Sequence, residues 1–178
     1  TTWTNIGMIY VGYEWANNNS LLVRSGADVT CAGATIGQGY HAPETADSVE
    51  VTIGSDNNSA TVTGTGSTWS CGTGDLVVGY YGSNNSLTIS DGGLVTAGSL
   101  TIGSGNAINI DNGCLALNGD KTSEILTLIE GGTIRVFSGE AFVTLTTDNY
   151  ADYVFYFADI EAGNHALADT YGLSGAYT

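Results

Sequence analysis

Side chains that could act as catalysts are few and scattered in this sequence. Its two histidines, His41 and His165, lie in no catalytic motif, and the Gly-X-Ser-X-Gly pattern of a serine hydrolase is absent. His41 precedes Ala42-Pro43-Glu44, which reads as a surface loop insertion. Asp56 and Asp75 fall in predicted turns, and nothing places two carboxylates across a groove, as glycoside hydrolysis requires. We therefore predict no catalytic residue and no enzymatic activity.

Metal ligands are equally sparse. Cys31, Cys71 and Cys114 are widely spaced and form no Cys-X-X-Cys pair, so a zinc site is not predicted. Oxygen-rich turns suit calcium, and Asp56-Asn57-Asn58 and Asp111-Asn112 are the best candidates. The calcium-binding nonapeptide is absent, however, and solvated turns are the favoured interpretation. We predict no metal and no cofactor, with calcium as the alternative.

The composition points to an extracellular protein rich in tight turns. The chain has 26 glycines and one proline, which excludes collagen and suits short strands joined by turns. Three basic residues against 18 acidic ones give a net charge of -15, which opposes binding to nucleic acid or anionic membranes. No apolar run approaches the roughly 18 residues of a membrane span. The start at Thr1, without an initiator Met, is consistent with a removed signal peptide or a domain edge.

An internal repeat with an offset of about 66 residues is the strongest pattern in the chain. Residues 2–39 and 68–105 are identical at nearly half of their aligned positions. The residues that mark the repeat are Trp3 with Trp69, Gly12 with Gly79, and Asn19 with Asn85. Within the repeat, a glycine followed by Asn-Asn-Ser recurs ahead of strand-like stretches. This spacing predicts about three coils of roughly 22 residues in each repeat.

The strand-like stretches alternate between apolar and polar residues. Residues 86–90 place Leu87 and Ile89 towards a core and hydroxyl side chains towards water. The turns between strands are marked by Ser25-Gly26, Asp91-Gly92-Gly93 and Asn112-Gly113. Three strands and three turns make a triangular coil, and stacked coils pair their strands. The sequence therefore predicts an all-β solenoid over residues 1–119, with a β-sandwich as the main alternative.

Repeated polar and aromatic residues have two interpretations each. Trp3 and Trp69, and likewise Tyr13 and Tyr80, would stack sugars if exposed and would form a packing ladder if buried. Repetition at a fixed coil position favours packing. The Asn-Asn-Ser copies are read as turns whose amides stack between coils. Because the cysteine gaps are about twice the predicted coil length, we expect neighbouring cysteines to lie two coils apart, about 10 Å. This is too far for a disulfide within the stack, so the cysteines are expected to be unpaired, or one of them to bond across subunits.

Residues 120–178 differ from the repeats, with fewer asparagines and glycines and more aromatic residues. The stretches 125–129, 133–137 and 154–157 are predicted strands, the first with apolar residues on both faces. We interpret this part as terminal coils with an aromatic-rich C-terminal cap. The alternative is a segment that docks on another subunit.

Several of these motifs together resemble a known family. Thr65-Gly66-Ser67-Thr68-Trp69, Gly79-Tyr80 and residues 85–93 (NSLTISDGG) resemble the passenger repeats of bacterial autotransporters and of other large secreted β-helix proteins. The resemblance covers about residues 1–119. It implies a right-handed parallel β-helix outside the cell, with no catalytic residue. The chain departs from that family in its length and in lacking the strand series of an autotransporter barrel.

These observations predict a secreted structural protein, a subunit of an extracellular filament built by end-to-end stacking of β-solenoids with itself as partner. The residues predicted to take part in assembly are Trp3, Val154, Phe155, Tyr156 and Phe157. One alternative is an adhesin or glycan-binding passenger fragment whose partner is an extracellular glycan. A polysaccharide-active β-helix enzyme is the least favoured alternative.

Overall fold

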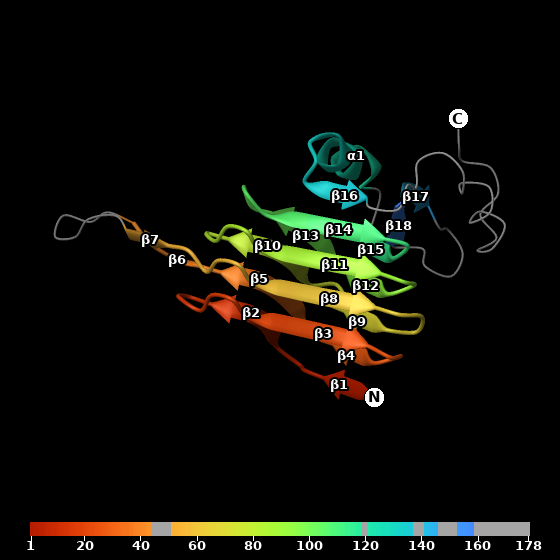
Figure 1. The fold of residues 1–178 in the computed structure, drawn as a ribbon, viewed down its shortest axis with the longest axis horizontal. Coiled ribbons are helices and arrows are strands. Elements are labelled where there is room, and N and C mark those ends of the chain that lie inside the picture. The colour runs from red at the N-terminus through yellow and green to blue at the C-terminus, as the bar shows by residue number, and fades with distance from the viewer. Residues whose placement is uncertain (44–50, 119–120, 137–140, 146–152, 159–178) are drawn as a thin grey trace.

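A computed structural model describes residues 1–43, 51–118, 121–136, 141–145 and 153–158. The described residues are mostly β-strand, arranged in parallel sheets, as the sequence predicts for an all-β fold. Figure 1 shows the strands stacked in layers from the N-terminal end, with one helix, α1, beside the last layer. In the part of the chain that the structure describes, no helix is long and apolar enough to cross a membrane.

Three sheets form the body of the molecule. In spatial order, sheet A contains β1 (Thr2–Thr4), β4 (Asp28–Thr30), β9 (Thr68–Ser70), β12 (Leu94–Ala97), β15 (Cys114–Asn118), β18 (Tyr153–Ala158) and β17 (Ala141–Leu145). Sheet B contains β13 (Ser99–Ile102), β10 (Asp75–Tyr80), β5 (Gly33–Gln38) and β2 (Met8–Tyr13). Sheet C contains β16 (Ile134–Val136), β14 (Ala107–Asp111), β11 (Ser86–Ser90), β8 (Ser59–Thr63) and β3 (Ser20–Arg24).

The chain visits sheets B, C and A in turn, and each visit to all three is called a circuit here. Circuit 1 is β2, β3 and β4; circuit 2 is β5, β8 and β9; circuit 3 is β10, β11 and β12; and circuit 4 is β13, β14 and β15. Each strand pairs in parallel with its counterpart in the next circuit. A strand that lies between two circuits therefore has its backbone hydrogen bonds completed on both sides.

Columns of buried apolar side chains run through the circuits. Val23, Val62, Ile89 and Ile110 are register partners in sheet C, and each is no more than 2% exposed. Residues on either side of them in the strands are only partly buried or exposed, which is the predicted period of two. The turns also behave as predicted, because Asp91 and Asn112 adopt left-handed backbone conformations with φ of 52° and 55°.

The recurring asparagines form a hydrogen-bonded ladder that is buried at Asn58, Asn85 and Asn106 and exposed at its end, Asn19. The Asn85 Oδ1 accepts hydrogen bonds from the backbone N–H and the Nδ2 of Asn58, at 2.8 and 3.0 Å. In the same way, Asn106 Oδ1 accepts two hydrogen bonds from Asn85, and Asn58 Oδ1 accepts two hydrogen bonds from Asn19. Gly79 lies against this ladder with φ of 77°, and a Cβ there would overlap the Asn106 amide. The repeated glycine and the repeated asparagine are therefore one packing unit.

The number of coils per repeat was predicted wrongly. Successive ladder asparagines, Asn19, Asn58, Asn85 and Asn106, are 39, 27 and 21 residues apart. The first two intervals together make up the 66-residue offset, so the repeat spans two circuits and not three. Circuit 2 is long because it contains β6 (Tyr40–Ala42) and β7 (Val51–Ile53), an antiparallel hairpin that projects from the stack (Figure 1). Residues 44–50, between β6 and β7 in the sequence, lie outside the described residues.

The strand predicted at 125–129 is also wrong, because Thr122–Glu130 is a helix, α1. Ile125, Leu128 and Ile129 recur with helical spacing, and all three face the core: Ile125 is fully buried and the other two are partly buried. The two other predicted strands are present as β16 and β18. β18 pairs antiparallel with both β15 and β17, which ends the parallel arrangement of sheet A.

Candidate functional site

Exposed tyrosines gather at one side of the stack, where the strands of sheet B end. Tyr13, Tyr40, Tyr80 and Tyr81 line a surface pocket of about 260 Å³, and between 43% and 52% of each residue is exposed. The lining is completed by Glu14, Gln38, Gly39 and His41. We call this pocket the aromatic groove. Such a concentration of exposed aromatic surface is typical of an interaction site.

The strand register sets the spacing of the groove. Tyr13, Gln38 and Tyr80 occupy the same position at the ends of β2, β5 and β10. Because paired strands lie about 4.8 Å apart, the two tyrosine positions are about 10 Å apart along the stack. The circuits therefore space the two aromatic side chains, with the Gln38 amide between them.

Two groove residues have unusual backbone conformations. Glu14 and Tyr81 follow the last residues of β2 and β10, and their φ angles are 54° and 60°. Bulky L-residues rarely adopt this left-handed region, and such conformations are enriched at functional sites. Neither position is a glycine, which would adopt this backbone conformation at little energetic cost and which occupies many other turns of this chain. Conformational preference alone therefore does not account for the side chains found there.

The β6–β7 hairpin contributes the other wall of the groove. The His41 ring stacks on Tyr81 with 5.0 Å between ring centroids and 26° between planes, and its Nδ1 lies 2.9 Å from Thr52 Oγ1. Tyr81 also meets Tyr80 edge to face at 4.5 Å. The interaction of the two hydroxyls raises the pKa of Tyr81 above its ordinary value. The rings thus hold one another in place at the surface.

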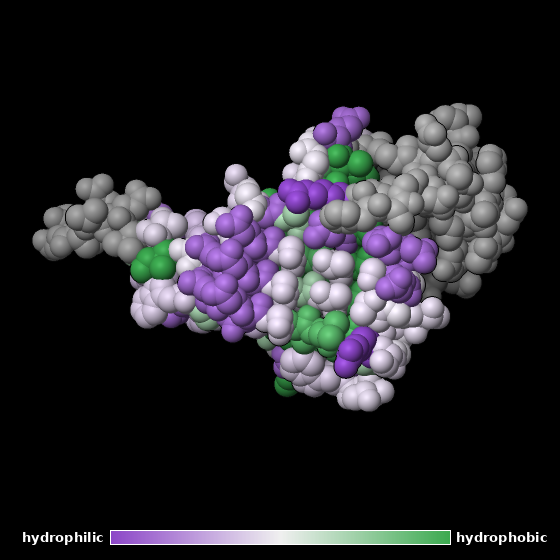
Figure 2. All heavy atoms as spheres, in the orientation of Figure 1, coloured by the Kyte–Doolittle hydropathy of each residue, from purple (hydrophilic) through white to green (hydrophobic). Residues whose placement is uncertain are grey.

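The groove is polar in its hydrogen-bonding groups, and neither lysine nor arginine lines it. Tyrosine hydroxyls, the Gln38 amide and the Glu14 carboxylate supply donors and acceptors, while the chain's basic residues Arg24, Lys121 and Arg135 are absent from the lining. Figure 2 shows hydrophilic residues gathered on the side of the body next to the β6–β7 hairpin. This combination of flat apolar rings and uncharged or acidic polar groups can bind a polyhydroxylated, uncharged molecule.

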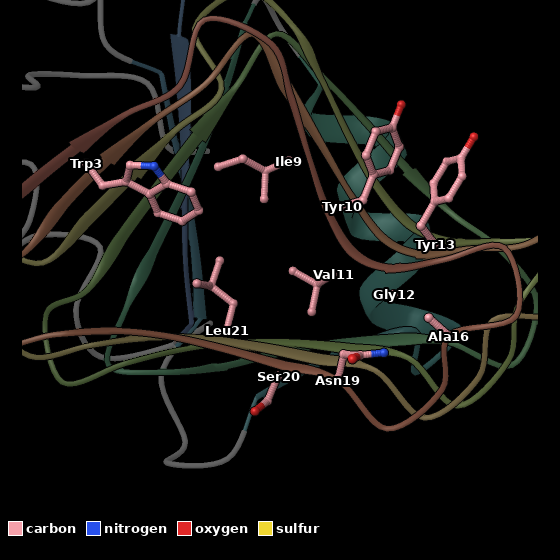
Figure 3. A pocket seen from close by; sticks show the side chains of 10 residues that line it. All are labelled: Trp3, Ile9, Tyr10, Val11, Gly12, Tyr13, Ala16, Asn19, Ser20 and Leu21. Carbon is pink, nitrogen blue, oxygen red and sulfur yellow. The ribbon is translucent and has the colours of Figure 1, made fainter.

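A second pocket, of about 420 Å³, opens at the outer face of circuit 1. Figure 3 shows Trp3, Ile9, Val11 and Leu21 pointing into the space that the circuit encloses, whereas Tyr10 and Tyr13 point away from it. Strands β1, β2 and β3 are also the edges of their sheets. This face therefore presents both apolar interior and unpaired strand edges.

The predicted repeat residues occupy equivalent positions in the circuits. Trp3 and Trp69 share a column of sheet A, with Val29 between them. Trp69 is fully buried, as the packing interpretation predicts, while Trp3 is 49% exposed because it lies in β1, the edge strand of sheet A. Gly12 and Gly79 both lie against the asparagine ladder, to which Asn19 and Asn85 belong. The predicted assembly residues Val154, Phe155, Tyr156 and Phe157 lie on β18.

The packing interpretation was wrong for Tyr13 and Tyr80, since both are exposed on the outer side of sheet B. Sequence reasoning did not select Gln38, Tyr40 or Tyr81. A usable signal was present in the dipeptide Gly-Tyr, which occurs at 12–13, 39–40 and 79–80 and places a tyrosine in the groove each time. Glycine packs on the ladder or under the hairpin, and the following side chain turns outward.

The candidate calcium ligands have partners within the chain. Asp56 Oδ1 accepts hydrogen bonds from the backbone N–H and the hydroxyl of Ser83, at 2.7 and 3.2 Å, and the Asn58 amide belongs to the ladder. Among the described residues, no group of three or more histidine, cysteine or acidic side chains could hold a metal ion. His165 lies outside the described residues.

We compared the chain with protein-family models, with curated proteins and with solved structures, and found no match in any of the three.

Proposed function

We propose that this chain is a secreted, non-catalytic surface protein with a right-handed β-solenoid fold, and that its aromatic groove binds an uncharged glycan. The internal repeat and the parallel register between circuits support the solenoid. The antiparallel β17–β18 hairpin supports a C-terminal cap, which a stack of coils needs where it ends. The observation on which the function rests is the aromatic groove.

Sugar rings and tyrosine rings are complementary surfaces. The C–H face of a pyranose is apolar and packs flat on an aromatic ring, while its hydroxyls need donors and acceptors around the rim. Tyr13 and Tyr80 provide rings at about 10 Å spacing along the stack. Gln38 between them and Glu14 beside them provide the polar partners. A glycan chain lying along the stack axis would meet both rings.

Charge selects among glycans. The net charge of -15 and the Glu14 carboxylate in the groove repel uronic acids, sulfates and sialic acids. Binding an acidic polysaccharide would require arginine or lysine contacts, and neither residue type lines the groove. An uncharged polysaccharide is not repelled by the acidic groups and needs no arginine or lysine contact. The proposed ligand class is therefore neutral hexose or N-acetylhexosamine polymers.

The test is retention of the purified chain on a panel of neutral and acidic polysaccharides. We expect retention on at least one neutral polymer and loss of that retention in the double variant Tyr13→Ala/Tyr80→Ala. Trp15→Ala is the matched control, because Trp15 is 62% exposed on the same circuit but does not line the groove. A chain that binds no neutral polymer, or a double variant that binds as well as Trp15→Ala, would refute the proposal.

A second candidate function is assembly, favoured by the open face of circuit 1. Trp3 and Leu21 border the 420 Å³ pocket there. The residues in the same columns deeper in the stack, Trp69 in circuit 2 and Leu87 in circuit 3, are fully buried. Stacking of a further coil on this face would bury the same positions and pair the edges of β1, β2 and β3. β18 offers no free edge for docking, because both its edges are paired within the chain.

Sedimentation velocity over a wide concentration range tests this assembly. A stacking face predicts association that strengthens with concentration and is abolished in Leu21→Asp, which puts a charge into the open cavity. The control Leu22→Asp changes the neighbouring residue, which is 52% exposed outside the cavity. Monomers of the unaltered chain at every concentration would exclude self-assembly and leave glycan binding unaffected.

A further inference from the structure

Two of the three cysteines lie next to each other on adjacent circuits. The Sγ atoms of Cys31 and Cys71 are 3.6 Å apart. Each cysteine directly follows a strand of sheet A, β4 or β9, at the same register position. The expected separation of about 10 Å is wrong, because the β6–β7 hairpin fills out a single circuit of 40 residues between them.

The backbone already has the spacing that a disulfide requires. The Cys31 N–H donates to the Ser70 carbonyl at 2.8 Å, and the Cys71 N–H donates to the Thr96 carbonyl at 2.8 Å, so the ladder continues through both residues. Neighbouring strands stand about 4.8 Å apart, and disulfides span Cα separations of about 4.4–6.8 Å. Bond formation therefore needs rotation of two side chains and no movement of the circuits.

We propose that Cys31 and Cys71 form a disulfide that links circuits 1 and 2 and closes the loop carrying the β6–β7 hairpin. The pair is enclosed, with Cys31 8% exposed and Cys71 fully buried. On one side of the pair, Asn5 follows β1 and donates its backbone N–H to the Thr30 carbonyl. On the other side, the fully buried Ala97 lies next to Cys71 in circuit 3. The third cysteine, Cys114, begins β15 at the register position of Leu94 and Thr68, so it lies outside this column.

The surroundings favour attack by Cys31. Its hydrogen bond with Cys71 lowers the pKa of Cys31 to about 6, against the opposing effect of burial. The same interaction raises the pKa of Cys71, which keeps its proton. Cys31 is also the more exposed of the two, so we assign it as the attacking thiolate and Cys71 as the resolving thiol.

The oxidant is a disulfide of the secretory or extracellular environment, such as oxidised glutathione. The Cys31 thiolate attacks one sulfur of the oxidant, forms a mixed disulfide and releases one glutathione thiolate. Cys71 then loses its proton, attacks the Cys31 sulfur and releases the second glutathione. Two electrons pass from the two cysteines to the oxidant, and their protons end on two molecules of glutathione.

The experiment is refolding of the full chain in a glutathione redox buffer, so that burial does not limit access. Remaining thiols are then blocked, and the chain is digested and mapped by mass spectrometry without reduction. We expect a Cys31–Cys71 linkage in most molecules and blocked Cys114. The linkage should persist in Cys114→Ser and vanish in Cys71→Ser. Reduction should lower the melting temperature of the unaltered chain by about 5–15 °C and leave Cys71→Ser unchanged.

Three outcomes would overturn the inference. These are free thiols at both positions after refolding, a glutathione adduct that stays on Cys31 without resolving, and a linkage of either cysteine to Cys114. Circular dichroism of each variant shows whether it has the strand content of the unaltered chain. Because Cys114→Ser keeps both proposed partners, the linkage can be tested even if Cys71→Ser does not fold.

Discussion

Replacing Asn85 with alanine removes the centre of the asparagine ladder. The Asn85 side chain takes part in four hydrogen bonds within the buried interior and is 1% exposed. Two are accepted from Asn58, and two are donated, to the Ser55 carbonyl at 2.9 Å and to Asn106 Oδ1 at 3.0 Å. Alanine leaves these partners without the hydrogen bonds that Asn85 provides and without access to bulk water.

The expected loss in the free energy of unfolding follows from the number of hydrogen bonds that Asn85 makes. A typical intramolecular hydrogen bond contributes about 1 kcal/mol net, and a buried group left unpaired costs about 1–3 kcal/mol. Four bonds give an expected loss of about 4 kcal/mol in the free energy of unfolding for Asn85→Ala. The matched control is Asn84→Gly. Asn84 is exposed and has a φ of 55°, which glycine adopts freely, so the change should stay within about 0.5 kcal/mol.

Urea unfolding followed by far-ultraviolet circular dichroism and by tryptophan fluorescence measures both values. Agreement of the two probes would show that the unfolding free energy is well defined for this stack. A loss below about 1 kcal/mol for Asn85→Ala, indistinguishable from the control, would refute the reasoning. It would mean that the ladder amides exchange protein partners for water at no net cost.

Three further predictions concern single side chains. Trp69→Ala should cost about 3–5 kcal/mol in urea unfolding because Trp69 is fully buried, whereas Trp3→Ala, at the half-exposed equivalent position, should cost less than about 1 kcal/mol. Gly79→Ala should lower the melting temperature strongly because a Cβ meets the ladder, and Gly72→Ala, with open space around it, should show only the smaller cost of its φ of 58°. The rate at which Cys31 exchanges with a small disulfide should rise with pH through a midpoint near 6, since the thiolate is present above its pKa. An unchanged rate between pH 5 and 7.5, rising only near the usual thiol pKa of about 8.5, would contradict the last of these.

The period of the strands and the recurrence of glycine and asparagine could be predicted from the sequence, because both reflect local requirements. Leu87 and Ile89 alternate with polar neighbours as a half-buried strand must. Asp91 and Asn112 stand where left-handed turns are needed. The coil count failed because a hairpin inserted in circuit 2 lengthens the spacing without changing the register, and a repeat offset cannot distinguish two unequal circuits from three equal ones.

The candidate site was harder to predict than the strands. The repetition of Tyr13 and Tyr80 is compatible with side chains that are buried and with side chains that are exposed. Whether a side chain faces the core or the solvent depends on whether it stands an odd or an even number of residues after the glycine that packs on the asparagine ladder. Tyr81 reaches the groove only because its backbone is left-handed, which no sequence pattern of an aromatic residue indicates. α1 was missed because Ile125 and Ile129 in a short apolar stretch satisfy strand and helix periods alike.

The most direct test of glycan binding is nuclear magnetic resonance of the chain with isotope-labelled tyrosine rings, titrated with neutral oligosaccharides. The account predicts saturable shifts for the rings of Tyr13, Tyr40, Tyr80 and Tyr81, with assignments from single Tyr→Phe variants. Acidic oligosaccharides of equal length should produce none. Unmoved groove rings with every neutral oligosaccharide, or shifts confined to tyrosines elsewhere in the chain, would contradict the proposal that the aromatic groove is a glycan-binding site.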